Sequence, residues 1–214
     1  MTKLIPALNV QNFDEFKSKI NYLYPQVKHF HFDLATLEFC QFETFPDIFA
    51  VERLNLKVTF DLHLMDFFQP TELLKYNKSY IKSVIFHPRG TLKISQAIKI
   101  LKKIKKKIFL AFDLEENFNN LEILRWCDGF LFLGVKPGKS GQQFNEEILE
   151  KVKFYLPIIK KLKKKIGFDG GLTEETLPLV LKFKPHFIVM GKAIYDSPQP
   201  LNYYFKFLNY LKKL

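Results

Sequence analysis

The chain has 214 residues, with 33 lysines and arginines against 22 aspartates and glutamates, and its formal net charge is +11. The length is enough for one core of ordinary size, and fractions of 47% hydrophobic and 26% charged residues exclude wholesale disorder. Two cysteines are too few for a disulfide scaffold, and neither a signal-peptide core nor an apolar run of roughly 18 residues is present, so we expect a cytoplasmic protein without a membrane span.

Short apolar runs alternate with helical patterns along the chain. The apolar runs predict strands over Lys3–Leu8, Lys28–Asp33, Lys57–Leu64, Ile81–His87, Lys107–Asp113, Gly129–Val135, Lys165–Asp169 and His186–Met190. The helical patterns cover Phe16–Leu23, Leu73–Tyr76, Asn145–Leu162, Thr173–Phe183 and Leu201–Leu211. Segments 40–54 and 117–125 show no clear pattern.

Eight such repeats in 214 residues are the count of a (β/α)₈ TIM barrel near its lower size limit. We therefore expect residues 1–214 to form a single barrel domain, with an open doubly wound sheet as the structural alternative. In a barrel, the chemistry lies at the carboxyl ends of the strands.

The positive charge is concentrated in two lysine runs, at residues 102–107 and 160–165. Both follow helical patterns, where lysines oppose the helix dipole and remain solvated. A nucleic-acid patch is the alternative, but only three of the positive residues are arginines, the residue that base and phosphate recognition favours. We expect most of these lysines to form a solvated surface, with no nucleic-acid partner.

Two histidines and two aspartates stand at or near the ends of the second, third and seventh predicted strands. His31 and Asp33 are two residues apart, so their side chains share one face of a strand, and His63 and Asp169 end two others. Imidazole and carboxylate groups bind divalent transition metals. Taken singly, such a histidine is more often a core residue and such an aspartate a helix cap. Four of them at one barrel mouth favour a metal site.

Glycines follow the seventh and eighth predicted strands. Gly170 and Gly171 come after Asp169, and Gly191 and Lys192 follow the eighth strand. Loops in these places of a barrel commonly hold a phosphate on backbone N–H groups. Tight turns alone are the alternative explanation. We favour phosphate binding.

Five short motifs carry a family resemblance. They are His31-x-Asp33, Asp61-x-His63-Leu64-Met65, Val135-x-Pro137-Gly138-x-x-Gly141-Gln142-x-Phe144, Asp169-Gly170-Gly171 and Gly191-x-Ala193-Ile194-Tyr195. In order and spacing the chain resembles the ribulose-phosphate 3-epimerase family over nearly its whole length.

The resemblance implies a ribulose-phosphate-binding (β/α)₈ barrel that binds one divalent metal through His31, Asp33, His63 and Asp169. It implies that Asp33 and Asp169 are the acid/base pair, and that D-ribulose 5-phosphate and D-xylulose 5-phosphate are the substrates. The donor set admits Zn²⁺, Fe²⁺, Mn²⁺ or Co²⁺. The resemblance and the glycine pattern together place the phosphate against Gly138, Ser140, Gly141, Gly170, Gly171, Gly191 and Lys192.

The lining of the expected site departs from the family pattern. The segment from Ala35 to Phe42 replaces the family's Met-Asp-Gly motif, and the glycine-rich loop contains Lys139 and Ser140. We interpret Lys136, Lys139 and Lys192 as additional positive charge at the phosphate corner. Met65 is retained as a lining residue, and His87 either lines the site or packs structurally.

Three other functions compete with this interpretation. A hexulose-6-phosphate 3-epimerase would use the same mechanism, and the altered segment 35–42 would select the substrate. The decarboxylases and synthases on related barrels carry an Asp-x-Lys-x-x-Asp motif, which the sequence after Asp33 lacks. A non-catalytic barrel that binds a phosphorylated ligand would hold no metal. Homo-oligomers are also open, since the 24 phenylalanines suit either a contact face or a core.

Overall fold

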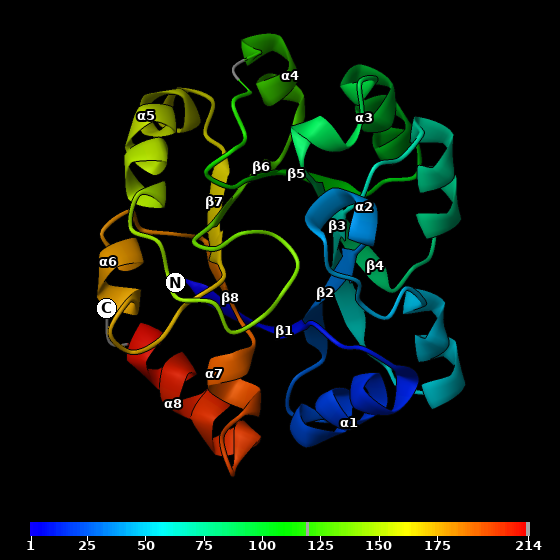
Figure 1. The fold of residues 1–214 in the computed structure, drawn as a ribbon, viewed down its shortest axis with the longest axis vertical. Coiled ribbons are helices and arrows are strands. Elements are labelled where there is room, and N and C mark those ends of the chain that lie inside the picture. The colour runs from blue at the N-terminus through cyan, green and yellow to red at the C-terminus, as the bar shows by residue number, and fades with distance from the viewer. Residues whose placement is uncertain (119, 213–214) are drawn as a thin grey trace.

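In residues 1–118 and 120–212, the part of the chain that the computed structural model describes, eight parallel strands close into a barrel in chain order. The last strand pairs with the first, so the barrel has no free edge. Helical segments surround it (Figure 1). The predicted TIM barrel is confirmed, and the open sheet is excluded. The strands are β1 (Lys3–Leu8), β2 (His29–Ala35), β3 (Thr59–Met65), β4 (Ile81–Phe86), β5 (Lys107–Phe112), β6 (Gly129–Leu133), β7 (Lys165–Asp169) and β8 (Phe187–Met190).

The helical segments differ more from the predicted ones than the strands do. The α-helices are α1 (Phe13–Leu23), α2 (Leu37–Cys40), α3 (Ile94–Lys103), α4 (Leu121–Trp126), α5 (Ile148–Lys161), α6 (Leu177–Leu181), α7 (Lys192–Tyr195) and α8 (Pro200–Lys212). Short 3₁₀ helices are η1 (Ile48–Leu54), η2 (Pro70–Tyr76) and η3 (Pro88–Gly90). Of the segments without a clear pattern, 40–54 contains η1, and 117–125 contains most of α4.

Two predicted helices are wrong in extent or type. The helix expected from Thr173 begins only at Leu177, because Pro178 is accommodated in a first turn and not in a helix interior. The segment around Leu73 is a 3₁₀ helix, with Pro70 in its first turn.

Phenylalanine fills both layers of the core. Inside the barrel, Phe109 and Phe187 pack edge to face, with ring centroids 5.3 Å apart. Between the barrel and the helices, nine phenylalanines are fully buried, among them Phe112, whose ring lies 4.8 Å from that of Tyr155 on α5. The phenylalanines therefore serve mainly as core residues rather than as a contact face between subunits.

The lysine runs lie at helix ends, as predicted. Lys102 and Lys103 are in the last turn of α3, and Lys160 and Lys161 are in the last turn of α5. After the second of these helices, Lys164 Nζ donates to the carbonyls of Arg125 and Cys127 at 2.7 and 2.6 Å. These lysines therefore neutralise helix ends and loop carbonyls. Among the described residues, no helix combines the length and apolar character needed to cross a bilayer.

Candidate functional site

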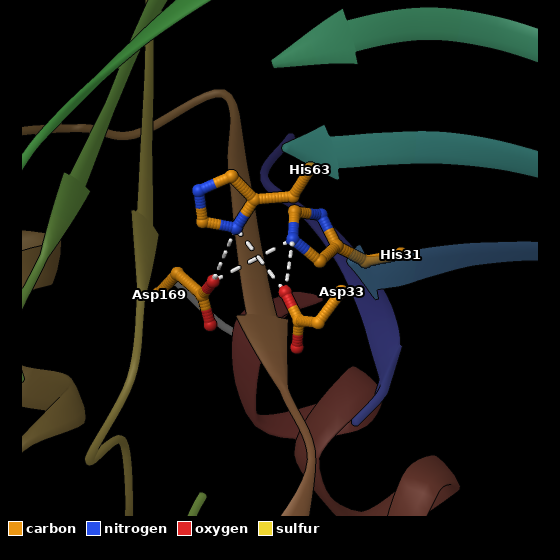
Figure 2. A group of neighbouring side chains, drawn as sticks. All are labelled: His31, Asp33, His63 and Asp169. Atoms are coloured by element: carbon orange, nitrogen blue, oxygen red, sulfur yellow. Dashed lines mark hydrogen bonds and ion pairs between the residues drawn. The ribbon is translucent and has the colours of Figure 1, made fainter. Parts of the chain in front are cut away.

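The four metal-ligand candidates meet at the mouth of the barrel (Figure 2). Asp33 on β2 is in register with His63 on β3, which places their side chains next to each other. His63 Nδ1 lies 3.1 Å from Asp33 Oδ1, and His31 Nε2 lies 3.2 Å from the same oxygen. Asp169 arrives from β7, with Oδ2 at 3.6 Å from His31 Nε2 and 3.9 Å from His63 Nδ1. One ligand atom from each residue lies within 4.8 Å of all the others.

Burial and mutual contacts shift the pKa values of the residues in this cluster. Burial alone would lower the pKa of His31, but the close contact with Asp33 and its charge, together with the charge of Asp169, raise it to about 9. Burial would raise the pKa of Asp33, yet its contacts with His31 and His63 hold that pKa well below its usual range. Burial raises the pKa of Asp169 to about 7 against the opposing charge of His31, and Asp33 adds to the rise. The two carboxyl groups therefore differ strongly in proton affinity.

The cluster suits a divalent cation. His31 Nε2 is fully buried and has no hydrogen-bond partner among the described residues, although it points at two carboxylate oxygens. A buried polar atom without a partner is costly, and a cation between these two nitrogens and two oxygens would remove the cost. A set of two imidazoles and two carboxylates is typical of zinc, iron or manganese sites.

Above the cluster lies a cavity of about 780 Å³. Asp33, His63, Met65 and Asp169 form part of its wall, whereas His31 is buried below them. Three loops, after β6, β7 and β8, complete it. Every residue predicted to hold the phosphate lines this cavity, and so do the two other lysines of interest: Lys136, Gly138, Lys139, Ser140, Gly141, Gly170, Gly171, Gly191 and Lys192.

The loop of residues 135–144 crosses the mouth (Figure 1) and is fastened on both sides. The N–H of Gly138 donates to Met65 Sδ at 3.1 Å, and its carbonyl accepts from Asn9 Nδ2 at 2.7 Å. Gly171 has a φ of +70°, and a Cβ there would lie 2.6 Å from the backbone nitrogen of Phe144. Position 171 therefore requires glycine, both for its backbone conformation and for the space that the chain leaves there. The tight turn thus explains this glycine, which also belongs to the pattern that predicted phosphate binding.

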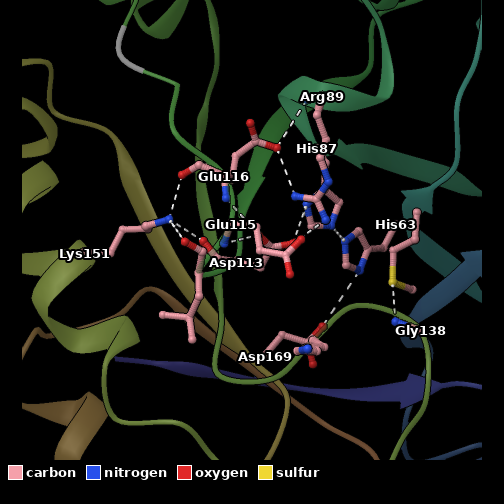
Figure 3. Close-up of polar contacts among 12 residues, drawn as sticks. His63, His87, Arg89, Asp113, Glu115, Glu116, Gly138, Lys151 and Asp169 are labelled. Atoms are coloured by element: carbon pink, nitrogen blue, oxygen red, sulfur yellow. Dashed lines mark hydrogen bonds and ion pairs between the residues drawn. The ribbon is translucent and has the colours of Figure 1, made fainter. Parts of the chain in front are cut away.

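His87 does not line the cavity, which corrects one of the two roles considered for it. It is fully buried behind His63, with the two Nε2 atoms 3.2 Å apart (Figure 3). Burial lowers the pKa of His87 well below its usual value, and the neighbouring His63 and the charge of Arg89 add to the effect.

A second polar group surrounds His87, and the sequence did not single it out. Arg89 Nη2 donates to Asp113 Oδ2 at 2.6 Å, and Arg89 Nη1 donates to Glu116 Oε2 at 3.3 Å. Asp113 and Glu116 are both buried. The only signal for this group was the position of Asp113 at the end of the fifth predicted strand.

Comparisons with known proteins identify the family of this chain. The sequence profile described as "Ribulose-phosphate 3 epimerase family" matches residues 3–195. The ribulose-phosphate 3-epimerase of Mycoplasma genitalium is 27% identical over 200 residues, covering 92% of this chain and 91% of that protein. That of Buchnera aphidicola subsp. Baizongia pistaciae is 29% identical over 175 residues, covering 78% and 76%.

Solved structures share the fold. The 3-hexulose-6-phosphate synthase of Salmonella typhimurium superimposes with a TM-score of 0.72 at 15% identity, covering 99% of both chains. Orotidine 5'-monophosphate decarboxylase of Methanocaldococcus jannaschii gives 0.65 at 15% identity, covering 98% of both chains. At such identities the likeness concerns the barrel alone.

Proposed function

Since this chain belongs to the ribulose-phosphate 3-epimerase family and is an isomerase that acts on carbohydrates, we propose that it interconverts D-ribulose 5-phosphate and D-xylulose 5-phosphate. The observation that carries the proposal is the pair of carboxyl groups at the cavity wall, Asp33 and Asp169, whose pKa values burial and the histidines push apart.

Epimerisation next to a ketone removes a proton from one face of a carbon and returns one to the other face. A single base would tend to return the proton to the face it left, so two groups are needed. Asp33 is ionised at neutral pH and accepts the proton. Asp169, with a pKa of about 7, holds a proton that it delivers to the opposite face, and the reverse reaction exchanges the roles.

Each carboxyl group turns one oxygen towards the histidines and the other away from them (Figure 2). His31, His63, Asp33 and Asp169 would hold one divalent ion of zinc, iron, manganese or cobalt, which would act as a Lewis acid on the ketone and stabilise the enediolate oxygens. The oxygens that face away from the histidines remain for proton transfer.

The phosphate would bind on the far side of the cavity, against the N–H groups of Gly170 and Gly171 and the ammonium group of Lys192. On the opposing loop, Ser140 would add its hydroxyl group, Gly141 its backbone N–H group and Lys139 its positive charge. Held there, the sugar's reacting carbon would lie between the two carboxyl groups.

Metal analysis of the purified protein, followed by a coupled epimerase assay with and without chelator, tests the proposal. We expect about one divalent ion per chain and turnover of D-ribulose 5-phosphate that chelation abolishes and added metal restores. Turnover of a hexulose 6-phosphate instead would assign the alternative substrate. Turnover of neither, in a metal-loaded protein, would refute the epimerase function.

A further inference from the structure

His63 presents one ring nitrogen to the ligand cluster and the other to a second buried ring. Its Nδ1 faces Asp33 Oδ1 at 3.1 Å, and its Nε2 lies 3.2 Å from Nε2 of His87. The two imidazole planes are inclined by only 20°, with centroids 5.3 Å apart. A nitrogen–nitrogen contact of this length contains one proton, so one ring donates and the other accepts.

The surroundings of His87 decide which ring donates. Its Nδ1 is buried, lacks a hydrogen-bond partner among the described residues, and lies 3.5 Å from Asp113 Oδ2. Asp113 is an acceptor, because Arg89 donates to Oδ2 at 2.6 Å and the N–H groups of Glu115 and Glu116 donate to Oδ1 at 2.9 and 3.0 Å. With its Nδ1–H towards Asp113, His87 has only a lone pair to offer at Nε2.

We propose that His87 and Asp113 are positioning residues that keep the proton of His63 on Nε2, which leaves Nδ1 of His63 free to bind the divalent metal. This inference rests on the metal site of the proposed function. A metal-binding histidine commonly donates its other N–H to a fixed acceptor, which sets its tautomer and its ring orientation. Here the acceptor is a second histidine, His87, and the carboxylate of Asp113 contacts the other ring nitrogen of His87.

The positions of this pair are fixed from several directions. The guanidinium of Arg89 neutralises the charge of Asp113, so the group needs no positive charge on His87, whose ring is neutral. Lys151 Nζ on α5 donates to the carbonyls of Asp113, Leu114 and Glu116 at 2.6, 2.7 and 2.6 Å, which holds the loop after β5 (Figure 3).

An aromatic side chain of α2 covers the outer side of this group. The ring of Phe39 lies 5.2 Å from the ring of His87 and 4.7 Å from the guanidinium of Arg89. His87 itself is inaccessible to solvent. Since a buried carboxylate is costly to keep, the arrangement is better explained by control of His63 than by stability alone.

Metal affinity, measured by competition between the full-length protein and a chromophoric chelator for Zn²⁺ and Co²⁺, tests the role of His87. Leucine at position 87 cannot accept a hydrogen bond, whereas the glutamine amide can accept from His63 and donate to Asp113. We expect His87→Leu to weaken metal binding about 10–100-fold and His87→Gln to stay within about threefold of wild type. In the ¹⁵N NMR spectrum of the zinc-loaded protein, we expect the Nε2–H of His63 to be protected in wild type and to exchange rapidly in His87→Leu.

His29→Leu is the matched control. Like His87, His29 is a histidine close to an aspartate, since its Nε2 lies 2.9 Å from Asp61 Oδ2. It lies at the amino end of β2, away from the ligand cluster. Its loss should leave metal affinity unchanged. If His87→Leu does not fold, as judged by its melting curve, His87→Met supplies a second side chain that cannot accept this hydrogen bond.

Unchanged metal affinity in the folded His87→Leu or His87→Met protein would overturn the positioning role and leave the epimerase function standing. Weakened affinity without turnover of either sugar phosphate by wild type would refute the proposed function alone. Absence of Zn²⁺ and Co²⁺ binding by wild type would overturn the positioning role and the metal site together.

Discussion

Replacing Asp169 with asparagine removes one proton-transfer group while keeping the size of the side chain. One oxygen of Asp169 lies 3.6 Å from His31 Nε2 and 3.9 Å from His63 Nδ1, and its pKa of about 7 lets it both hold and accept a proton at neutral pH. A positioned acid or base contributes about 10²–10⁴-fold to a rate. We therefore expect kcat to fall by about that factor, equivalent to about 2.7–5.4 kcal/mol on the barrier. KM should change by less than about threefold, because asparagine keeps the size of the side chain and the proposed phosphate contacts are backbone N–H groups and Lys192.

Exchange in D₂O makes this prediction sharper. In Asp169→Asn, Asp33 can still remove a proton from the epimer that it faces and return a deuteron to the same face. The variant should therefore exchange the hydrogen of one epimer with solvent without forming the other, as NMR of the sugar phosphate would show. Assays are run with saturating metal, and metal content is measured, because the same carboxylate is also a proposed ligand.

Glu175→Gln is the matched control, since Glu175 lines the same cavity without belonging to the ligand cluster. It should retain wild-type kcat. If metal-loaded Asp169→Asn epimerises within about tenfold of the wild-type rate, the two-carboxylate mechanism is wrong.

The remaining predictions concern pH, charge and backbone conformation. Below a pKa of about 9, His31 holds a proton that a bound cation must displace, so metal affinity should rise with pH from 6 to 9 by up to about tenfold per unit. Calorimetry in buffers of different ionisation enthalpy counts the released protons, and an affinity independent of pH would contradict the proposed ligand set. Lys192→Ala should raise KM for the sugar phosphate about tenfold at low salt and less at high salt. Lys184→Ala is the control and should leave KM unchanged, because Lys184 lies between α6 and β8 and does not line the cavity. An unchanged KM in Lys192→Ala would contradict a role of Lys192 in phosphate binding. Gly171→Ala should destabilise the protein by about 1–3 kcal/mol in denaturant unfolding, because φ is +70° and the new Cβ would meet the backbone of Phe144, and an unaltered midpoint would contradict this.

The strands were predictable because each is a short apolar run bounded by charged or turn-forming residues. β1 and β7 have the predicted bounds. β4, β5, β6 and β8 differ by one or two residues at one end, and β2 and β3 differ by one or two residues at both ends. The helical segments were less predictable. Proline positions and side-chain hydrogen bonds decide where the helical segments begin, as at Leu177 and in η2. Hydrophobic periodicity contains no information on either effect.

The ligand candidates were visible in the sequence because each is a polar residue at or near the end of an apolar run, and four of them at one barrel mouth are hard to explain by core packing or capping alone. Convergence of β7 on β2 and β3 depends on barrel closure, which brings residues 31 and 169 together although 138 positions separate them. The loops around the cavity likewise follow the order of the strands. For these parts, topology and strand period were sufficient.

Only the tertiary structure decided what stands behind His63. His87 and Asp113 directly follow the consecutive strands β4 and β5. A strand pattern shows neither how deep a side chain lies nor whether it points to the cavity or to a neighbouring ring. The register between β3 and β4 shifts at Phe60 and Asp61, and this offset cannot be read from composition or period. The sequence by itself therefore determined the barrel and the four polar residues at its mouth. Register and packing, which depend on contacts between distant segments, determined the histidine pair that orients one of them.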